Sequence, residues 1–200
     1  IATKDGYSEL STGLLGNDEG WNDIAFGLKY VLHADKEKDY VVSAGMRYMA
    51  EHGHRGILQG GTDEFSPFVS LAKGYDNLHL ISNVTLRVPT DTNQGNVVGH
   101  WDVHLDYSIN PESDTVVAPV FEVHGVHYLD DGATALPIGG LDYANLGTQP
   151  AKNFVAWAGI GGRLEINKQF EFGVVYEFAL TDKKDDIMDT RLTIDFIARW

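Results

Sequence analysis

The sequence contains no cysteine, so it has no disulfide bond and no thiolate that could bind a metal or act as a nucleophile. Cations are scarce too: 15 Lys and Arg stand against 29 Asp and Glu, a formal net charge of −14. Because the nucleic-acid backbone is bound by clustered cations, this balance argues against a nucleic-acid partner. Walker, Rossmann and nucleophile-elbow patterns are also absent, and we expect neither an enzyme nor a cofactor.

Long apolar runs are missing as well. The longest, from residue 154 to residue 162, is short and rich in glycine, well below the roughly 18 residues of a transmembrane helix. If such a chain spans a membrane, it must do so as a closed β-barrel, because lipid cannot satisfy unpaired backbone groups.

The sequence has instead a strong period of two. Between residues 97 and 110 the odd positions are apolar or glycine, and the even positions after Val98 are polar, including His100, Asp102, His104 and Asp106. Similar patterns predict strands near residues 5–15 (the weakest), 20–33, 39–51, 64–74, 78–89, 97–110, 115–129, 153–167, 169–181 and 187–200. Many of these exceed the usual length of about five or six residues in soluble sheets and suit a bilayer.

The connections between the expected strands alternate in length. Tight connections near residues 34–38, 75–77, 110–114 and 167–168 alternate with longer ones near 52–63, 90–96, 130–152 and 181–186. Bacterial outer-membrane barrels have short periplasmic turns and longer external loops. We therefore expect both termini on the periplasmic side of a bacterial outer membrane.

Alternation alone does not say which face points outward, since a soluble lipocalin-like barrel also alternates, with its apolar side inward. The apolar face carries almost no charge, Lys73 at a strand end being the exception, and aromatic residues gather near strand ends, which favours contact with lipid. We predict an all-β, antiparallel up-and-down transmembrane barrel of about ten strands, as one domain over residues 1–200. Its lumen would hold a charge network of Lys29, Arg47, Arg87, Asp102, Asp106, Arg163, Glu165, Glu171, Glu177, Arg191 and Asp195.

The last expected strand carries a more specific signal. Its in-phase residues are Leu192, Ile194, Phe196, Ala198 and Trp200. This pattern resembles the C-terminal signature of outer-membrane proteins, a final amphipathic strand that the barrel-assembly machinery recognises. The alternative is an ordinary edge strand that happens to end on tryptophan.

Two short motifs suggest a narrower relationship. The segment from Trp21 to Tyr30, which contains Gly27-Leu-Lys-Tyr30, and the segment Leu86-Arg-Val-Pro-Thr-Asp91 resemble a family of outer-membrane transporters associated with phenol-degradation pathways. Asp91 stands where that family usually has glycine. The resemblance implies passage of small, often hydrophobic compounds, and no catalytic or binding residue can be transferred. It also implies that about two strands precede Ile1, giving about twelve, and the lack of a start methionine or leader pattern fits a processed or incomplete chain.

The sharpest local cluster is His100, Asp102 and His104 on one face of one strand, with His79 and His124 expected inward on the neighbouring strands. Imidazoles and carboxylates bind divalent metals, but residues two apart on a strand lie about 6.6–7 Å apart, so one strand alone chelates poorly. Hydrogen-bonded lumen filling is therefore the preferred interpretation, and we expect no metal.

Two functions remain open. A narrow channel for small hydrophobic or weakly polar solutes is the first. The second is a structural barrel with a filled lumen that anchors external loops or a partner protein, since about eight strands are just filled by side chains and ten are only slightly wider. Hydrolase chemistry at His52 and His54 is disfavoured, because no serine stands in a matching arrangement. Expected partners are outer-membrane lipid and, during biogenesis, the barrel-assembly machinery.

Overall fold

The structure, a computed structural model, describes residues 4–7, 18–21, 24–51, 62–93, 95–130, 154–181 and 190–199. In these ranges the regular elements are all strands, arranged in two sheets. The short strands β1 (Lys4–Tyr7) and β2 (Asp18–Trp21) pair with each other. No helix in the ranges given is long and apolar enough to cross a membrane.

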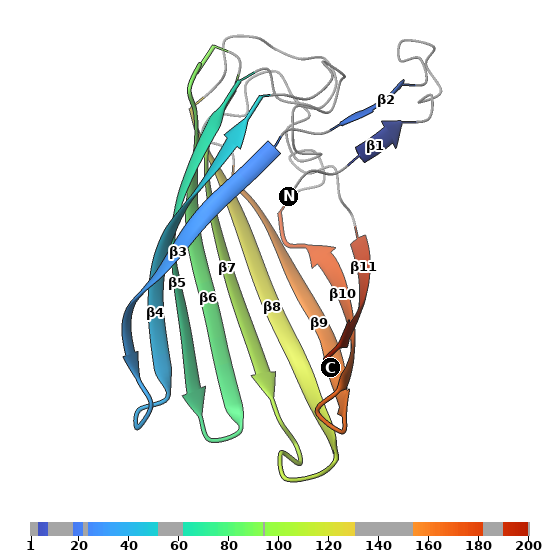
Figure 1. The fold of residues 1–200 in the computed structure, drawn as a ribbon. Coiled ribbons are helices and arrows are strands. Elements are labelled where there is room, and N and C mark those ends of the chain that lie inside the picture. Colours follow the sequence, from blue (N-terminus) through green and yellow to red (C-terminus); the bar gives the residue numbers. More distant parts are fainter. Residues whose placement is uncertain are drawn as a thin grey trace.

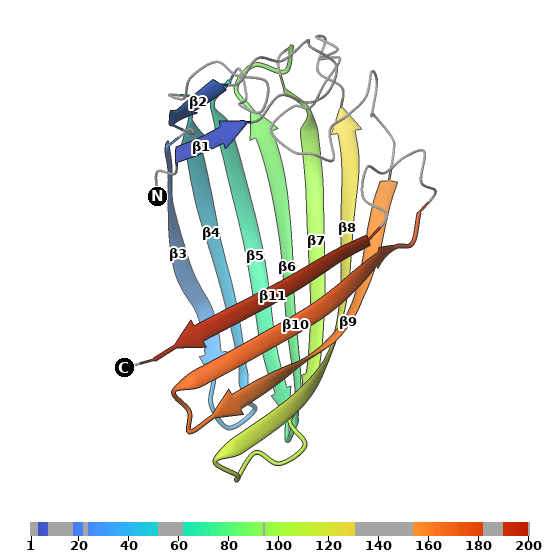
Figure 2. The same cartoon turned by 90° about the vertical axis from the view of Figure 1, so that its right-hand side faces the viewer.

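The remaining strands form one sheet. Its members are β3 (Ile24–Asp35), β4 (Tyr40–Ala50), β5 (Glu64–Tyr75), β6 (Leu78–Pro89), β7 (Val97–Tyr107), β8 (Thr115–Asp130), β9 (Phe154–Ile166), β10 (Phe170–Ala179) and β11 (Thr190–Ala198). Each strand pairs antiparallel with the next one along the chain, so the sheet is an up-and-down meander. Figures 1 and 2 show it curled around a common axis like a barrel wall, with β3 and β11 at its two edges. The predicted fold class is thus confirmed.

The first predicted strand, over residues 5–15, requires a correction. Residues 4–7 pair with 18–21 in the separate two-stranded sheet, and residues 8–15 lie outside the described part of the chain. The large sheet therefore has nine strands where about ten were expected. The physical reason is the weakness of the pattern: glycine and polar residues interrupt the apolar row that a strand needs to present to lipid.

The odd number of strands in the large sheet also decides where its first and last residues lie. Because β3 and β11 run in the same direction, Ile24 and Ala198 lie at opposite ends. The expectation of both termini on one side depended on the strand over residues 5–15. In the structure, β1 and β2 lie near the end that carries the long connections, whereas β11 runs toward the tight turns (Figure 1).

The tight turns all lie at one end of the sheet, and three of them use the left-handed backbone region. Asn167 and Lys168 have φ of 53° and 58°, the mirror-image turn that matches strand twist. Asp39 and Asp76 have φ of 48° and 54°, which short polar side chains tolerate well.

The two faces of the sheet differ sharply in chemistry. Large apolar side chains are exposed on the outer face, and Leu28 is 84% exposed. Others exposed in the same way include Phe26, Tyr30, Val69, Val84, Phe121, Ile160, Phe172, Tyr176, Leu192, Ile194 and Phe196. The buried polar side chains on the strands of the sheet are Ser43, Glu64, Ser66, Glu171 and Glu177. A lipocalin-like barrel would show the reverse, so the structure supports the lipid-facing interpretation of the alternation.

Candidate functional site

The candidate site is the lumen, by which we mean the space bordered by the inner face of β3–β11. Its wall carries arginine–glutamate clusters and a row of alternating histidines and carboxylates. Each side chain comes from the inward phase of its strand, so the period-two pattern brings together groups that are far apart in the sequence.

The first cluster joins β5 and β6. Arg87 donates from Nε to both carboxylate oxygens of Glu64, at 3.0 and 2.9 Å, and from Nη2 to Oε2 at 2.7 Å. The Ser66 hydroxyl donates to Glu64 Oε1 at 2.7 Å. The two charged side chains are only 17% and 6% exposed, so this pair is largely shielded from water.

The second cluster contains the most deeply buried carboxylate. Glu177 on β10, 2% exposed, accepts two hydrogen bonds of 2.5 Å from Arg191 and one of 3.3 Å from the Thr193 hydroxyl, both on β11. Gly159 on β9 is its register partner, and a Cβ there would meet Glu177 Cγ at 3.1 Å and Val175 Cγ1 at 2.8 Å. The glycine therefore provides the space that the buried carboxylate occupies.

The third cluster lies near the tight turns of the last strands. Glu171 accepts from Arg163 Nη1 at 3.0 Å and from Arg199 Nη2 at 2.6 Å. Arg199 Nη1 is also 3.6 Å from Glu165. One buried carboxylate thus holds two guanidinium groups at this end of the lumen.

The histidine–carboxylate row crosses from β6 to β8. His79 Nδ1 lies 2.7 Å from Asp106 Oδ1, and the other oxygen of Asp106 lies 3.2 Å from His104 Nε2. His104 Nδ1 lies 2.6 Å from Glu122 Oε1. Both nitrogens of His104 therefore face carboxylates.

The row continues through His124 on β8. Its Nδ1 lies 2.8 Å from Asp102 Oδ1, and its Nε2 lies 3.6 Å from Glu122 and 3.8 Å from Glu177. Ionisable groups on four strands are thereby linked, and the row reaches the buried Glu177–Arg191 pair. Such a wall offers polar contacts to a passing solute or, when fully paired, stiffens a closed lumen.

The structure places the predicted network as follows. Arg163 meets Glu171 and Arg191 meets Glu177, whereas Asp102 and Asp106 contact histidines. The side chains of Lys29, Arg47 and Asp195 form no hydrogen bond or ion pair within the described ranges, and Asp195 packs over Gly173.

The weak metal candidate has the geometry of separate pairs. Asp102 contacts His124, His104 contacts Asp106 and Glu122, and His100 Nε2 is buried with no hydrogen-bond partner in the structure. No three such groups among the described residues are placed to share one ion.

Glu64 is a lumen residue that the predicted network left out. Its signal was available, since it shares its phase on β5 with Ser66 and Ser70. Phe68 and Ala72 are apolar residues in the same inward phase, so the alternation along β5 is irregular. The prediction therefore did not include Glu64, which is the partner of Arg87 in the structure.

A smaller polar contact lies at the long-connection end. Asp63, just before β5, accepts from the Tyr48 hydroxyl at 2.6 Å and from the Glu51 backbone N–H at 2.8 Å. The Tyr48 hydrogen bond, assisted by the Glu51 N–H, holds the pKa of Asp63 below its ordinary value. His52 and His54, which were weighed for hydrolase chemistry, lie outside the described residues.

Among solved structures, the chain is similar to one described as NanC porin in a rhombohedral crystal form. The two share 13% sequence identity with a TM-score of 0.58, over 100% of this chain and 92% of the porin chain. No family model matches the sequence, and no curated protein matches it. At this identity the likeness establishes a porin-like fold and does not support the narrower resemblance to phenol-pathway transporters.

Proposed function

We propose that the protein is a narrow channel of the bacterial outer membrane. The observation that carries this proposal is the inverted distribution of polarity, with exposed apolar side chains on the outer face and buried carboxylates on the inner face. A bilayer is the solvent that suits such an outer face, since charged side chains there are costly and apolar ones are not. The porin-like fold supports the same proposal.

The lumen suits small solutes. Arg87, Arg163 and Arg191 are each paired with a glutamate on the wall, so these charges attract ions less than isolated charges would. We therefore propose small hydrophobic or weakly polar compounds as the transported class. The short motifs that resemble phenol-pathway transporters point to the same class.

A structural barrel with a closed lumen is the second candidate. The burial of Glu64 and Glu177 favours it, because carboxylates this shielded resemble a packed interior more than a water-filled pore. This barrel would anchor its long connections or a partner protein at one membrane surface.

Solute flux separates the two candidates. The full chain would be reconstituted into liposomes, and swelling would be followed with small neutral solutes of increasing size. We expect flux for the smallest solutes and a sharp size limit. No flux above that of empty liposomes would contradict the channel and favour the structural barrel.

The orientation and assembly follow from the same proposal. We propose that the tight-turn end, toward which β11 runs, faces the periplasm, and that the barrel-assembly machinery recognises the outer row Leu192, Ile194, Phe196, Ala198 and Trp200. The first three are exposed on β11, and Trp200 lies outside the described residues. Replacing Phe196 with aspartate should slow assembly in membranes, whereas the inward Thr193→Asp change should slow it less.

A further inference from the structure

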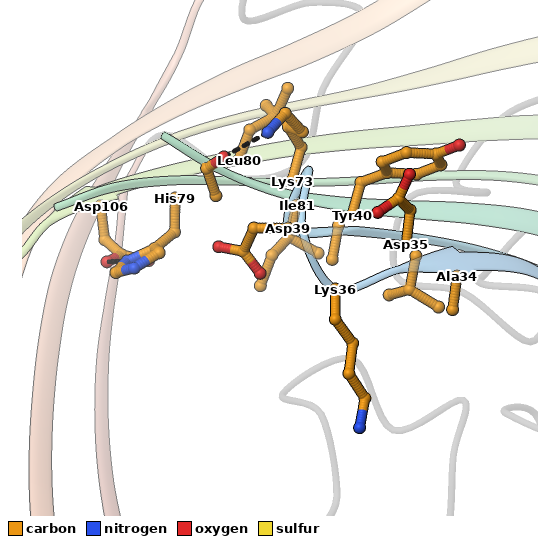
Figure 3. Close-up of a pocket in the computed structure, with 13 residues that line it drawn as sticks. Ala34, Asp35, Lys36, Asp39, Tyr40, Lys73, His79, Leu80, Ile81 and Asp106 are labelled. Carbon is orange, nitrogen blue, oxygen red and sulfur yellow. Dashed lines mark hydrogen bonds and ion pairs between the residues drawn. The ribbon is translucent and has the colours of Figure 1, made fainter. Parts of the chain in front are cut away.

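A pocket of about 440 Å³ opens on the inner face at the tight-turn end of the lumen. It lies against β3 to β7 and the turn that joins β3 to β4 (Figure 3). None of the arginine–glutamate clusters described above lines it.

The floor of the pocket is an apolar row that crosses four strands. Ala34 on β3 is the register partner of Val41 on β4, Val41 of Ala72 on β5, and Ala72 of Ile81 on β6. Ile81 is 48% exposed although it stands on the inner face, where the neighbouring rows are polar. An apolar surface of this kind, open to water inside a polar lumen, gains by contact with an apolar molecule.

The next row toward the turns supplies a polar edge. The Asp39 carboxylate lies directly over Gly74, so closely that a Cβ on residue 74 would clash with it. Figure 3 shows this carboxylate on the side of the pocket where His79 and Asp106 meet. His79 Nδ1 lies 2.7 Å from Asp106 Oδ1, so this edge of the pocket carries the carboxylates of Asp39 and Asp106, which are acceptors for a donating ligand.

The lysines nearby do not occupy this edge. The Lys73 ammonium donates to the backbone oxygens of Lys38 and Gly74 and lies 4.1 Å from the centre of the Tyr75 ring. Lys38 is 3.6 Å from Asp35. Figure 3 shows the Lys36 side chain pointing away from Asp39.

We propose that this pocket binds a small organic ammonium ion with an alkyl or aryl body. The body would lie on Val41, Ala72 and Ile81, and the ammonium group would donate to Asp39 beside His79. The inference goes beyond the solute class proposed above by adding an amphipathic cation, and it rests on the proposed channel for its role as a solute subsite at one mouth of the lumen. Weak binding is suited to that role, because a transported solute must also leave.

Binding to the detergent-solubilised full chain tests the proposal, with 2-phenylethylamine as the probe and titration calorimetry against empty micelles as the blank. The neutral 2-phenylethanol and the anionic phenylacetate have the same body and different heads. We expect the amine to bind about tenfold more tightly than the alcohol, and phenylacetate to bind more weakly still.

Matched variants locate the site. Asp39→Asn keeps a residue that tolerates positive φ, and we expect it to weaken amine binding about fivefold or more. Asp76→Asn is its control, another left-handed aspartate in a tight turn at the same end, outside the pocket lining. Ile81→Ala should weaken all probes with an aryl body, whereas Ile160→Ala on the outer face should not.

Equal affinity for the amine and the alcohol, or equal effects of Asp39→Asn and Asp76→Asn, would overturn the proposal. Its failure can be told apart from failure of the channel because liposome flux is measured separately. Flux without amine discrimination removes the subsite and keeps the channel. Amine binding without flux keeps the pocket as a ligand site and removes the channel.

Discussion

Replacing Arg87 with alanine tests whether the lumen is packed or water-filled. The change removes the three hydrogen bonds that Arg87 donates to Glu64, whose carboxylate is only 6% exposed while Arg87 is present. Breaking a buried pair in this way typically costs about 3–5 kcal/mol, whereas an exposed pair contributes about 0–1 kcal/mol. Ser66 still donates to Glu64 after the change, so we expect a loss of about 3 kcal/mol.

The measurement is urea unfolding of the full chain in lipid vesicles, with conductance recorded in parallel. Glu64→Gln combined with Arg87→Ala should recover much of the loss, because it leaves no buried unpaired charge. Lys29→Ala is the control, since Lys29 is an exposed residue on the edge strand β3 and should change stability by about 0.5 kcal/mol or less.

A loss below about 1 kcal/mol for Arg87→Ala, with altered ion selectivity, would refute this reasoning. It would mean that water reaches Glu64 freely and that the lumen is open at this level. A large loss with unchanged conductance is the result that we expect from a narrow, paired interior.

Three further outcomes are expected. Unheated protein in detergent should run faster on a gel than boiled protein, and recovery as a soluble monomer without detergent would contradict the membrane assignment. Val69→Lys on the outer face should destabilise by about 2–4 kcal/mol in vesicles, and Ser70→Lys on the inner face by clearly less; equal losses would argue against a lipid-facing outer surface. Because the pKa of Asp63 is lowered, this carboxylate stabilises the folded protein fully at pH values above the ordinary pKa of aspartate. The stabilisation is lost as the pH falls through the lowered pKa. The stability difference between the wild type and Tyr48→Phe should therefore shrink in acid, and a difference that grows in acid would count against the Tyr48–Asp63 bond.

The positions of the strands in the large sheet can be predicted from the amino-acid pattern alone. The strand predicted over residues 78–89 coincides with β6, and the one predicted over 64–74 ends one residue before β5 does. This is possible because the period of two is a local property, set by the side on which successive residues emerge and by lipid on one of those sides. Where the pattern weakens, over residues 5–15, the prediction of a sheet strand was wrong for residues 4–7.

Which inward residues touch each other was decided by the tertiary structure. Arg87 meets Glu64, 23 residues away, because the turn at 76–77 fixes the register of β5 against β6. The period-two alternation shows only that each of these charged side chains points inward. Asp102 was therefore as reasonable a partner for Arg87 as Glu64 until the register was known.

The apolar floor of the pocket also depends on strand register and could not be predicted from the sequence. Val41, Ala72 and Ile81 appear in the sequence only as isolated apolar residues in the polar phase of three different strands. They become one surface because three antiparallel strands bring them into the same row. Register is a relation between segments distant in sequence, set by backbone hydrogen bonding and turn geometry, and a one-residue slip would move all of these side chains to the opposite face.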